Sequence, residues 1–265
     1  MGELLEALIL GIVQGLTEFL PVSSSGHLEI FKFILGDNST AEESLLTTVF
    51  LHFATALATV FLFHREVKAL LLAPFKKDDT ANRKLILFII VSMIPAALTG
   101  VFLEEHINTL FSQNLLLVGV CLLVTAFLLW VSEVIHEGGK KLNLIRALII
   151  GLSQAIAILP GISRSGATIS TSLLMGLDKE DAARFSFLMV VPLIFGKIAK
   201  DLISGDFSAD MPSIEYLAVG FLASFFTGLW ACRFMVKLVK ASRLHWFSIY
   251  CIIAGIFAIG ASIAY

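Results

Sequence analysis

The stretch Gln14-Gly-Leu-Thr-Glu-Phe-Leu-Pro-Val-Ser-Ser-Ser-Gly-His27 places polar side chains in an otherwise apolar part of the chain. Residues 4–13, which precede it, are mostly apolar. The stretch itself brings an amide, a carboxylate, three consecutive serines and a histidine. Polar groups at membrane depth are costly and usually mark function. We therefore take this stretch as the first candidate for a functional site.

The chain repeats this stretch once, at a shift of 140 residues, so that 148–166 match 8–26. The prolines, Pro21 and Pro160, are displaced by one residue. The match predicts a single membrane domain over 1–265 that is built from two repeats, about 1–135 and about 140–265. The identical positions are Gly11 and Gly151, Gln14 and Gln154, Ser23 and Ser163, Ser25 and Ser165, and Gly26 and Gly166.

The composition indicates a membrane protein. Of the 265 residues, 57% are hydrophobic and 15% are charged, and the mean hydropathy is +0.91. A soluble domain carries roughly 25% charged residues. Several stretches approach the roughly 20 apolar residues that span a bilayer. We predict an all-α polytopic protein in contact with membrane lipid, and the absence of a basic tract argues against a nucleic-acid partner.

The first polar stretch is predicted to form a re-entrant helical hairpin. A helix over 4–20 ends before Pro21, and a second helix follows over 27–35. Neither arm is long enough to cross a bilayer cleanly. A single kinked span is the alternative, but Glu29 and Lys32 would then lie in its second half. Irregular backbone survives at membrane depth only where protein or a polar cavity satisfies it.

The second stretch is predicted to form a matching hairpin from helices over 147–159 and 167–177. Each hairpin is followed by three predicted spans, which makes six in total. They cover 45–63, 85–103, 115–131, 185–203, 214–231 and 246–265.

The distribution of basic residues supports the hairpins. With both stretches re-entrant, four basic connections fall on one side, which the positive-inside rule makes the cytoplasm. These connections hold 15 of the 19 lysine and arginine residues, and both termini then lie outside. The basic connections are 64–84, 132–146, 178–184 and 233–245, and the acidic loops on the other side are 36–44, 104–114 and 204–213.

This arrangement predicts an inverted-topology repeat. Three spans is an odd number, so the second half enters the membrane from the side opposite to the first. The two hairpins then dip in from opposite sides, and their tips meet near the midplane. Many transporters have binding sites of this architecture.

Arg164 points to a phosphate ligand. It is the only charged residue between Arg146 and Asp178, and an arginine at membrane depth needs an anionic partner. Glu18 is one candidate partner, but a guanidinium fork also matches phosphate oxygens. Backbone N–H groups after Pro160 are expected to form an anion nest. The candidate substrate contacts are Gln14, Ser23, Ser25, Ser163, Ser165, Gly166 and Thr168.

The first tip carries groups suited to phosphoryl transfer. Glu18, with Gln14 beside it, is expected to hold Mg²⁺ or a similar cation against phosphate oxygens. His27 shares a helix face with Ser24 if the return helix starts early, and can then take a proton from Ser24 or from water. The alternatives are that the serines cap and turn the chain, and that His27 is a satisfied buried histidine. His52, in a predicted span, is expected to bond a neighbouring helix rather than serve the site.

Together these residues resemble the signature of a known family. Gln14-x-x-x-Glu18, the run from Pro21 to His27, and Pro160-Gly-x-Ser-Arg-Ser-Gly-x-Thr168 are similar to the motifs of the bacterial undecaprenyl-diphosphate phosphatases, the bacitracin-resistance family. The resemblance covers the whole chain. Gln14 is within the family pattern, although it provides one carboxylate fewer for a metal.

The resemblance implies an integral membrane phosphatase that depends on a divalent cation, Mg²⁺ or Ca²⁺. It implies hydrolysis of undecaprenyl diphosphate to undecaprenyl phosphate. Bacitracin would compete with the enzyme by binding the same substrate, undecaprenyl diphosphate. It also implies a bacterial cytoplasmic (inner) membrane location and a site open to the outer face. A homodimer is one candidate assembly, but the sequence does not fix the oligomeric state. Glu18 becomes the essential acid, Ser24 the candidate nucleophile with His27 as its partner, and Arg164 the clamp on the diphosphate.

Two other functions fit parts of the pattern. The inverted repeat alone suggests a transporter or lipid flippase that uses the same midplane phosphate site. A non-catalytic lipid-binding scaffold is the second rival. Release of phosphate from a solubilised lipid diphosphate separates an enzyme from both, because a pure transporter or scaffold releases none.

Overall fold

The computed structural model describes residues 2–35, 41–102, 114–135, 138–204, 212–241 and 243–264. Within these ranges the regular elements are helices, which confirms the all-α prediction, and the only β feature is an isolated bridge between Lys140 and Leu177. The helices are α1 (Glu3–Phe19), α2 (Ser24–Leu35), α3 (Ala41–Leu62), α4 (His64–Leu72), the 3-10 turn η1 (Ala73–Phe75), α5 (Thr80–Phe102), α7 (Leu115–Val134), α8 (Leu144–Ile156), α9 (Arg164–Leu174), α10 (Lys179–Ser204), α11 (Ile214–Lys240) and α12 (His245–Ala264).

The long helices agree with a multi-pass membrane protein. Among the described residues, α5, α7, α11 and α12 are long and apolar enough to cross a bilayer. A fifth crossing results if α3 is counted with α4 and η1, although the axis bends by 82° between them. The sixth predicted span, 185–203, falls in α10, part of whose C-terminal side chains lie outside the described residues.

Several connections are shorter than predicted. The predicted loop 64–84 contains α4 and η1, α10 begins at Lys179, and α11 continues to Lys240. Charged residues such as lysine are good helix formers, so a helix can continue past the point where its apolar stretch stops. The acidic loops predicted over 36–44, 104–114 and 204–213 lie largely outside the described residues.

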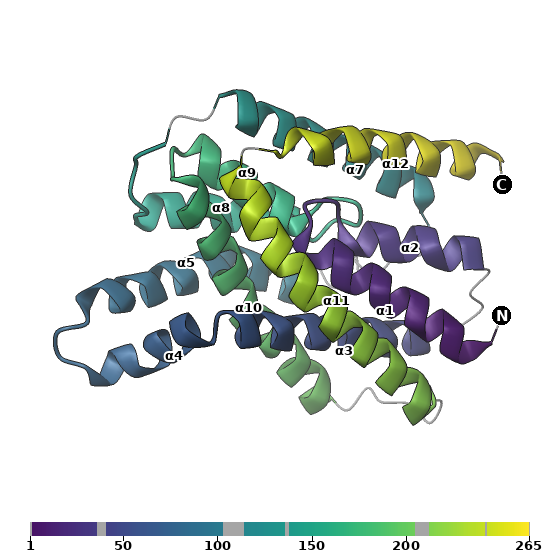
Figure 1. The fold of residues 1–265 in the computed structure, drawn as a ribbon, viewed down its shortest axis with the longest axis horizontal. Helices are drawn as coiled ribbons and strands as arrows, with labels where there is room; N and C mark the ends of the chain where they lie inside the picture. Colours follow the sequence, from purple (N-terminus) through teal and green to yellow (C-terminus); the bar gives the residue numbers. More distant parts are fainter. Residues whose placement is uncertain are drawn as a thin grey trace.

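Two short helical hairpins sit inside the bundle (Figure 1). The first is α1 and α2, joined by residues 20–23, and the second is α8 and α9, joined by residues 157–163. Helix α2 begins at Ser24, three residues before the predicted start, and α9 likewise begins three residues early at Arg164. The early starts place Ser24 and Arg164 in the first turns of their helices.

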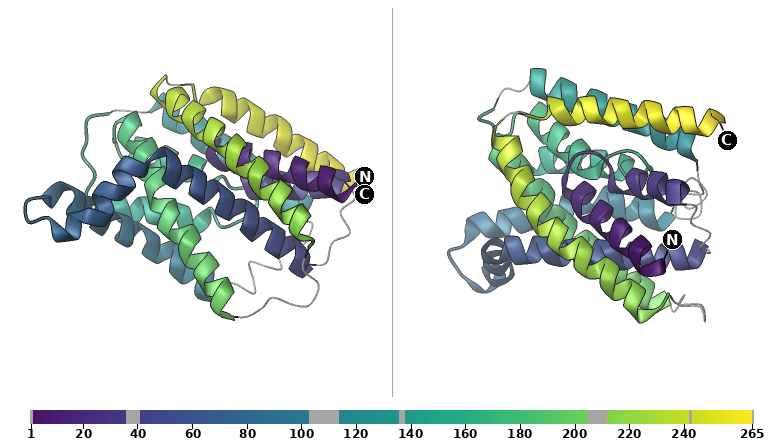
Figure 2. Two further views of the ribbon diagram at one scale, coloured as in Figure 1. Left: turned by 60° about the horizontal axis from the view of Figure 1, so that its bottom comes forward. Right: turned by 45° about the vertical axis from the view of Figure 1, so that its right-hand side comes forward.

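Each hairpin packs on a long helix from the other half of the chain. Helix α1 lies along α11, and α8 lies along α5, while α7 and α12 lie side by side (Figures 1 and 2). Gly11 of α1 faces the backbone of Gly220, and Gly151 of α8 faces the backbone of Ser92, too closely for a Cβ atom at either glycine. Small residues allow such close approach of helices. The two halves therefore use equivalent glycines for equivalent contacts.

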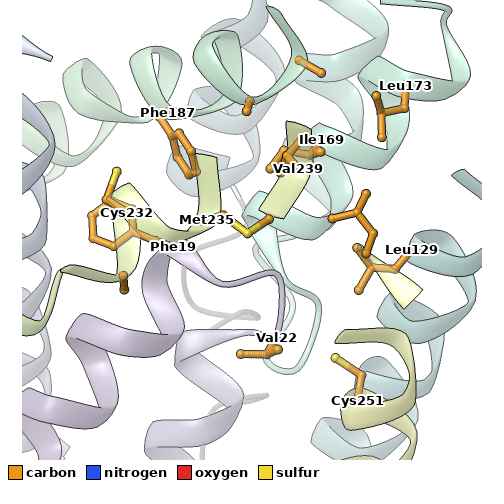
Figure 3. Packing of buried hydrophobic residues seen from close by; sticks show 14 of the residues in the cluster. Phe19, Val22, Leu129, Ile169, Leu173, Phe187, Cys232, Met235, Val239 and Cys251 are labelled. Atoms are coloured by element: carbon orange, nitrogen blue, oxygen red, sulfur yellow. The ribbon is translucent and has the colours of Figure 1, made fainter. Parts of the chain in front are cut away.

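The main hydrophobic core lies where the hairpin tips meet the long helices (Figure 3). The rings of Phe19, at the end of α1, and Phe187, in α10, pack edge to face with centroids 5.9 Å apart. Burial of these side chains fixes the tips within the bundle. Other members of the core are Val22, Leu129, Ile169, Leu173, Cys232, Met235, Val239 and Cys251.

Both termini lie at one end of the bundle, on the right of Figure 1. The connection between α4 and α5 and the connection between α7 and α8 lie at the opposite end. The basic connections predicted over 64–84 and 132–146 are therefore at the end away from the termini. This separation agrees with the charge segregation seen in the sequence.

Candidate active site

The tips of the two hairpins touch. Arg164, the first residue of α9, donates from Nη2 to Oε1 of Glu18, near the end of α1. Ser165 donates from Oγ to the carbonyl oxygen of Leu20, at 3.2 Å. These contacts join residues about half the chain apart. The structure thus brings both polar stretches into one site.

Glu18 is the centre of this site. Its Oε2 accepts hydrogen bonds from Ser24 Oγ at 2.7 Å and from Gln14 Nε2 at 3.0 Å. Nε2 of His52, from α3, lies 3.5 Å from the same oxygen. Together with Arg164 on Oε1, four side chains from four helices surround one carboxylate that is only 6% exposed.

Arg164 forms a buried ion pair with Glu18, one of the two partners that the sequence suggested for it. Its contact with a phosphate stays a prediction. Burial of both charges is costly, and removal of either partner leaves the other uncompensated. The pair therefore holds the tips together and also keeps a guanidinium and a carboxylate ready in the same place.

The backbone of Ser23 sets the geometry of the first tip. Ser23 has φ of 70°, a left-handed conformation that is rare for a residue other than glycine. Its Oγ accepts the N–H of Gly26 at 3.3 Å and so caps α2. Strained backbone of this kind costs about 1–3 kcal/mol and clusters at functional sites. The turn lets the next residue, Ser24, direct its hydroxyl to Glu18.

The second tip is anchored on α7. Gly161 has φ of 95° and lies so close to the carbonyl of Val118 that no Cβ atom fits. The N–H of Ser163 donates to Thr125 Oγ1 at 3.0 Å, and its Oγ accepts the N–H of Gly166 at 3.0 Å, capping α9. These contacts hold the start of α9 in place.

His27 is oriented by a residue from the last helix. Its Nδ1 lies 2.8 Å from the carbonyl oxygen of Ser23, and its Nε2 lies 2.7 Å from the hydroxyl of Tyr250. A carbonyl oxygen only accepts, so Nδ1 carries a proton and Nε2, in the neutral ring, accepts from Tyr250. The two rings also stack, with centroids 5.5 Å apart. Ser24, the expected partner of His27, instead donates to Glu18.

The other predicted hydroxyls bond within the tips. Thr168 Oγ1 donates to the carbonyl oxygen of Arg164 at 2.9 Å and lies 2.6 Å from Ser186 Oγ. All are buried except Ser25, which is half-buried, and their observed partners are parts of the protein. Their contact with substrate stays a prediction. The remaining hydroxyls of this set belong to Ser23, Ser25, Ser163 and Ser165.

Part of the backbone expected to form an anion nest after Pro160 and Gly161 bonds within the protein. The N–H of Ile162 donates to the carbonyl of Leu159 at 3.1 Å, and the N–H of Ser163 donates to Thr125. The Gly166 N–H is used by the cap. These three donors hold the turn and the cap, and an anion nest at the start of α9 stays a prediction.

Sequence reasoning missed two residues of this site. His52 is expected from the sequence to bond a neighbouring helix rather than serve the site. Instead its Nδ1 bonds the carbonyl of Thr48 in its own helix, at 2.7 Å, and its Nε2 faces Glu18 in the site. Tyr250 showed no signal at all, because it lies in the last helix, 223 residues after His27.

Comparison with known proteins gives this site a family. The sequence matches the family described as "Bacitracin resistance protein BacA" over residues 7–257. The chain belongs to this family. The match includes both hairpin tips and every residue of the site described above, and it confirms the resemblance found in the motifs.

Several relatives of the BacA family carry one name. The chain is 56% identical to the undecaprenyl-diphosphatase of Christiangramia forsetii, over 97% of each chain. It is 44% identical to the undecaprenyl-diphosphatase of Parabacteroides distasonis, over 97% of this chain and 98% of the relative. It is also 44% identical to that of Korarchaeum cryptofilum, over 96% of this chain and 97% of the relative.

The residues around Glu18 fit a hard divalent cation only as a partial set of ligands. Among the described residues, no three His, Cys, Asp or Glu side chains gather as a metal cage. However, Gln14 Oε1 is buried without a hydrogen-bond partner, next to the carboxylate of Glu18. Mg²⁺ prefers such oxygens and typically uses one or two carboxylates together with substrate phosphates. The site suits a cation that is shared with a phosphate ligand.

Proposed function

We propose that this chain is an undecaprenyl-diphosphatase, which removes the terminal phosphate of undecaprenyl diphosphate and releases undecaprenyl phosphate and inorganic phosphate. The observation that carries this function is the full-length similarity to undecaprenyl-diphosphatases, at 56% identity over 97% of the chain. The buried cluster of Arg164, Glu18 and Ser24 supplies the groups that this hydrolysis needs. As a hydrolase of the BacA family, the protein supports peptidoglycan synthesis and bacitracin resistance.

The test is release of inorganic phosphate from undecaprenyl diphosphate by the purified protein in detergent, with and without EDTA. We expect release that stops with EDTA and returns when Mg²⁺ or Ca²⁺ is added. A lack of phosphate release under every condition, with the protein folded, would overturn the enzymatic function. Release that EDTA does not affect would overturn only the cation requirement.

In the proposed reaction, Ser24 attacks the terminal phosphorus. Its Oγ already donates to Glu18 Oε2, so the carboxylate can accept the proton as the new P–O bond forms. The bond to the bridging oxygen breaks, and undecaprenyl phosphate leaves. Water then hydrolyses the phosphoserine and releases inorganic phosphate. Direct attack by a water that gives its proton to Glu18 is the alternative.

Arg164 binds the diphosphate in this proposal. A guanidinium can hold two phosphate oxygens with parallel hydrogen bonds. In the structure Arg164 forms an ion pair with Glu18, so an incoming diphosphate competes with that carboxylate for the guanidinium. This exchange couples binding to activation, because the incoming diphosphate releases Glu18 from Arg164 beside Ser24.

A divalent cation would be held by Glu18 and Gln14, together with phosphate oxygens of the substrate. When bound, such a cation neutralises negative charge on the transferring phosphate group. The protein contribution is the pair of oxygens: the carboxylate and the unpartnered Oε1 of Gln14.

We further propose that the two halves form an inverted-topology repeat, in which each half is a re-entrant hairpin followed by three membrane-spanning helices. Equivalent pairings of α1 with α11 and of α8 with α5 support this topology. The positive-inside rule supports a location in the cytoplasmic membrane with the first hairpin and the site facing outward. Bacitracin would then meet the substrate at the same face.

A homodimer and a lipid flippase remain lesser proposals. The apolar outer faces of α7 and α12 suit lipid as well as a second copy of the chain. Nothing in the described residues or the comparisons favours transport as the main function, and the relatives carry the name of an enzyme.

A further inference from the structure

The elbow that joins α3 to the first turn of α5, residues 64–84, carries large apolar side chains that are exposed. Helix α4 has no buried residues. Leu71 is 68% exposed, and Phe75, at the end of η1, is 85% exposed. The elbow lies at the end of the bundle opposite to the termini (Figure 1). Such exposure needs an apolar neighbour that the described residues do not supply.

The same elbow is rich in cations. Over residues 64–84, six lysine and arginine residues are accompanied by three acidic residues, a net charge of +3. Arg83 is used within the elbow, because it donates to the carbonyls of Ala73, Pro74 and Lys76. The remaining cations form no ion pair with a described residue, and they are Arg65, Lys68, Lys76, Lys77 and Lys84.

The position of the elbow along the membrane normal follows from its neighbours. Helix α3 ends at Leu62, and the candidate span of α5 begins at Thr80, so the elbow leads directly into a membrane-crossing segment. The axis turns by 82° between α3 and α4. A helix that lies across a spanning helix in this way runs close to the plane of the membrane surface.

The elbow is also a defined structure rather than a loose loop. The bonds from Arg83 hold η1, at 2.6 Å for the carbonyl of Lys76. Asn82 donates a side-chain and a backbone hydrogen bond to Asp79, which lowers the pKa of that carboxyl and fixes the start of α5. Lys76 and Lys77 therefore follow Phe75 in a turn whose backbone is fixed by hydrogen bonds from Arg83.

Only one medium satisfies both kinds of side chain. Water solvates the lysines but leaves Leu71 and Phe75 exposed, whereas hydrocarbon buries the rings but not unpaired charges. The headgroup layer accepts apolar side chains below and cations above, as it does for interfacial amphipathic helices. The excess of positive charge selects negatively charged headgroups. We propose that the α4–η1 elbow binds the headgroups of anionic phospholipids.

The test compares the full-length protein in nanodiscs of phosphatidylcholine alone and in nanodiscs that also contain phosphatidylglycerol. Amide hydrogen exchange is measured over residues 64–84. We expect exchange in this segment to be several-fold slower with phosphatidylglycerol, and the difference to shrink at high salt. The triple variant Lys68→Gln/Lys76→Gln/Lys77→Gln should lose the difference, because each lysine near an anionic surface strengthens binding about fivefold.

A matched control uses another exposed basic pair at the same end of the bundle. The variant Lys140→Gln/Lys141→Gln should keep the lipid-dependent slowing over 64–84. Equal exchange in both lipids, or equal loss of the effect in both variants, would overturn the proposal. Slowing by undecaprenyl diphosphate but not by phosphatidylglycerol would also overturn it, since the elbow would then be a substrate site. Unchanged exchange in α7 and α12 confirms that the variants are folded.

Discussion

At the scale of single residues, the site depends on how one carboxylate shares its two oxygens. Oε1 of Glu18 takes Arg164, and Oε2 takes Ser24 and Gln14. The proposed phosphate-binding guanidinium of Arg164 and the candidate nucleophile Ser24 therefore bond different oxygens of the same carboxylate. The arrangement makes separate predictions for the two partners.

Ser24→Ala tests the nucleophile. The variant removes the oxygen that Glu18 is placed to deprotonate, so we expect the rate of phosphate release to fall at least about 100-fold. Ser262→Ala serves as a control, because that hydroxyl bonds only the carbonyl of Ile259 within α12. If half of the rate survives in Ser24→Ala, water rather than serine attacks the phosphorus.

Arg164→Lys tests the guanidinium fork. Lysine keeps the positive charge but donates from a single nitrogen, so it loses the paired contact with phosphate. We expect kcat/KM for undecaprenyl diphosphate to fall at least about tenfold, which equals about 1.4 kcal/mol of activation free energy. Near-normal turnover would show that charge alone suffices and would contradict the proposed clamp.

Tyr250→Phe tests Tyr250 as a positioning residue. Phenylalanine keeps the stacked ring but removes the hydroxyl that bonds His27 Nε2. His27 in turn bonds the carbonyl of Ser23, the residue before Ser24, so its loss of a partner should disturb the position of Ser24. One such bond is worth about 0.5–1.5 kcal/mol, so we expect a roughly threefold to tenfold loss of rate. The dependence of rate on pH should also move, because the ring of His27 loses a partner. A pH profile identical to that of the parent protein would show that Tyr250 contributes only packing and does not position His27.

At the scale of elements, the tips are turns that only special backbone can make. The second tip needs the positive φ of Gly161 and also its close approach to the carbonyl of Val118 on α7. The first tip reaches a similar conformation at Ser23 without a glycine. Both helices that follow are capped by the serine at the turn. Turn, cap and functional side chain are thus consecutive in each hairpin.

Comparing Gly161→Ala with Gly139→Ala separates the cost of the positive φ from the cost of the close approach to α7. Both glycines have φ of 95°, but an added Cβ atom at Gly139 meets nothing within 4 Å. We expect Gly139→Ala to cost about 1 kcal/mol of unfolding free energy, the backbone contribution alone. Gly161→Ala should cost more and should also reduce phosphate release, because the start of α9 shifts. Thermal unfolding in detergent measures the difference, and equal losses would argue against the close packing of the tip.

At the scale of the whole molecule, both termini share one end of the bundle and basic connections occupy the other. The positive-inside rule then predicts which end faces the cytoplasm. Labelling of intact cells with a membrane-impermeant maleimide tests this orientation. Gly2→Cys should react and Lys140→Cys should not, and both should react once the cells are opened. The native cysteines are buried and provide a low background. Reaction of Lys140→Cys in intact cells would reverse the proposed topology.

The sequence by itself determined the class of the protein and the content of its site. Composition and long apolar segments indicate a helical membrane protein because the bilayer permits few other structures. The repeat at a shift of 140 pointed to two matching hairpins. The polar residues of their tips, together with the family resemblance, singled out Glu18, Ser24 and Arg164. These are properties of local sequence, so they can be recognised without any knowledge of distant neighbours.

Only the tertiary structure decided which groups meet. The choice of Glu18 as the partner of Arg164, the pairing of His27 with Tyr250 and the approach of His52 to the site all join residues from different helices. The N–H of Ser163, one of those expected in an anion nest, instead donates to Thr125 of α7. Such contacts depend on how helices from opposite halves of the chain pack. A local sequence pattern does not specify that packing.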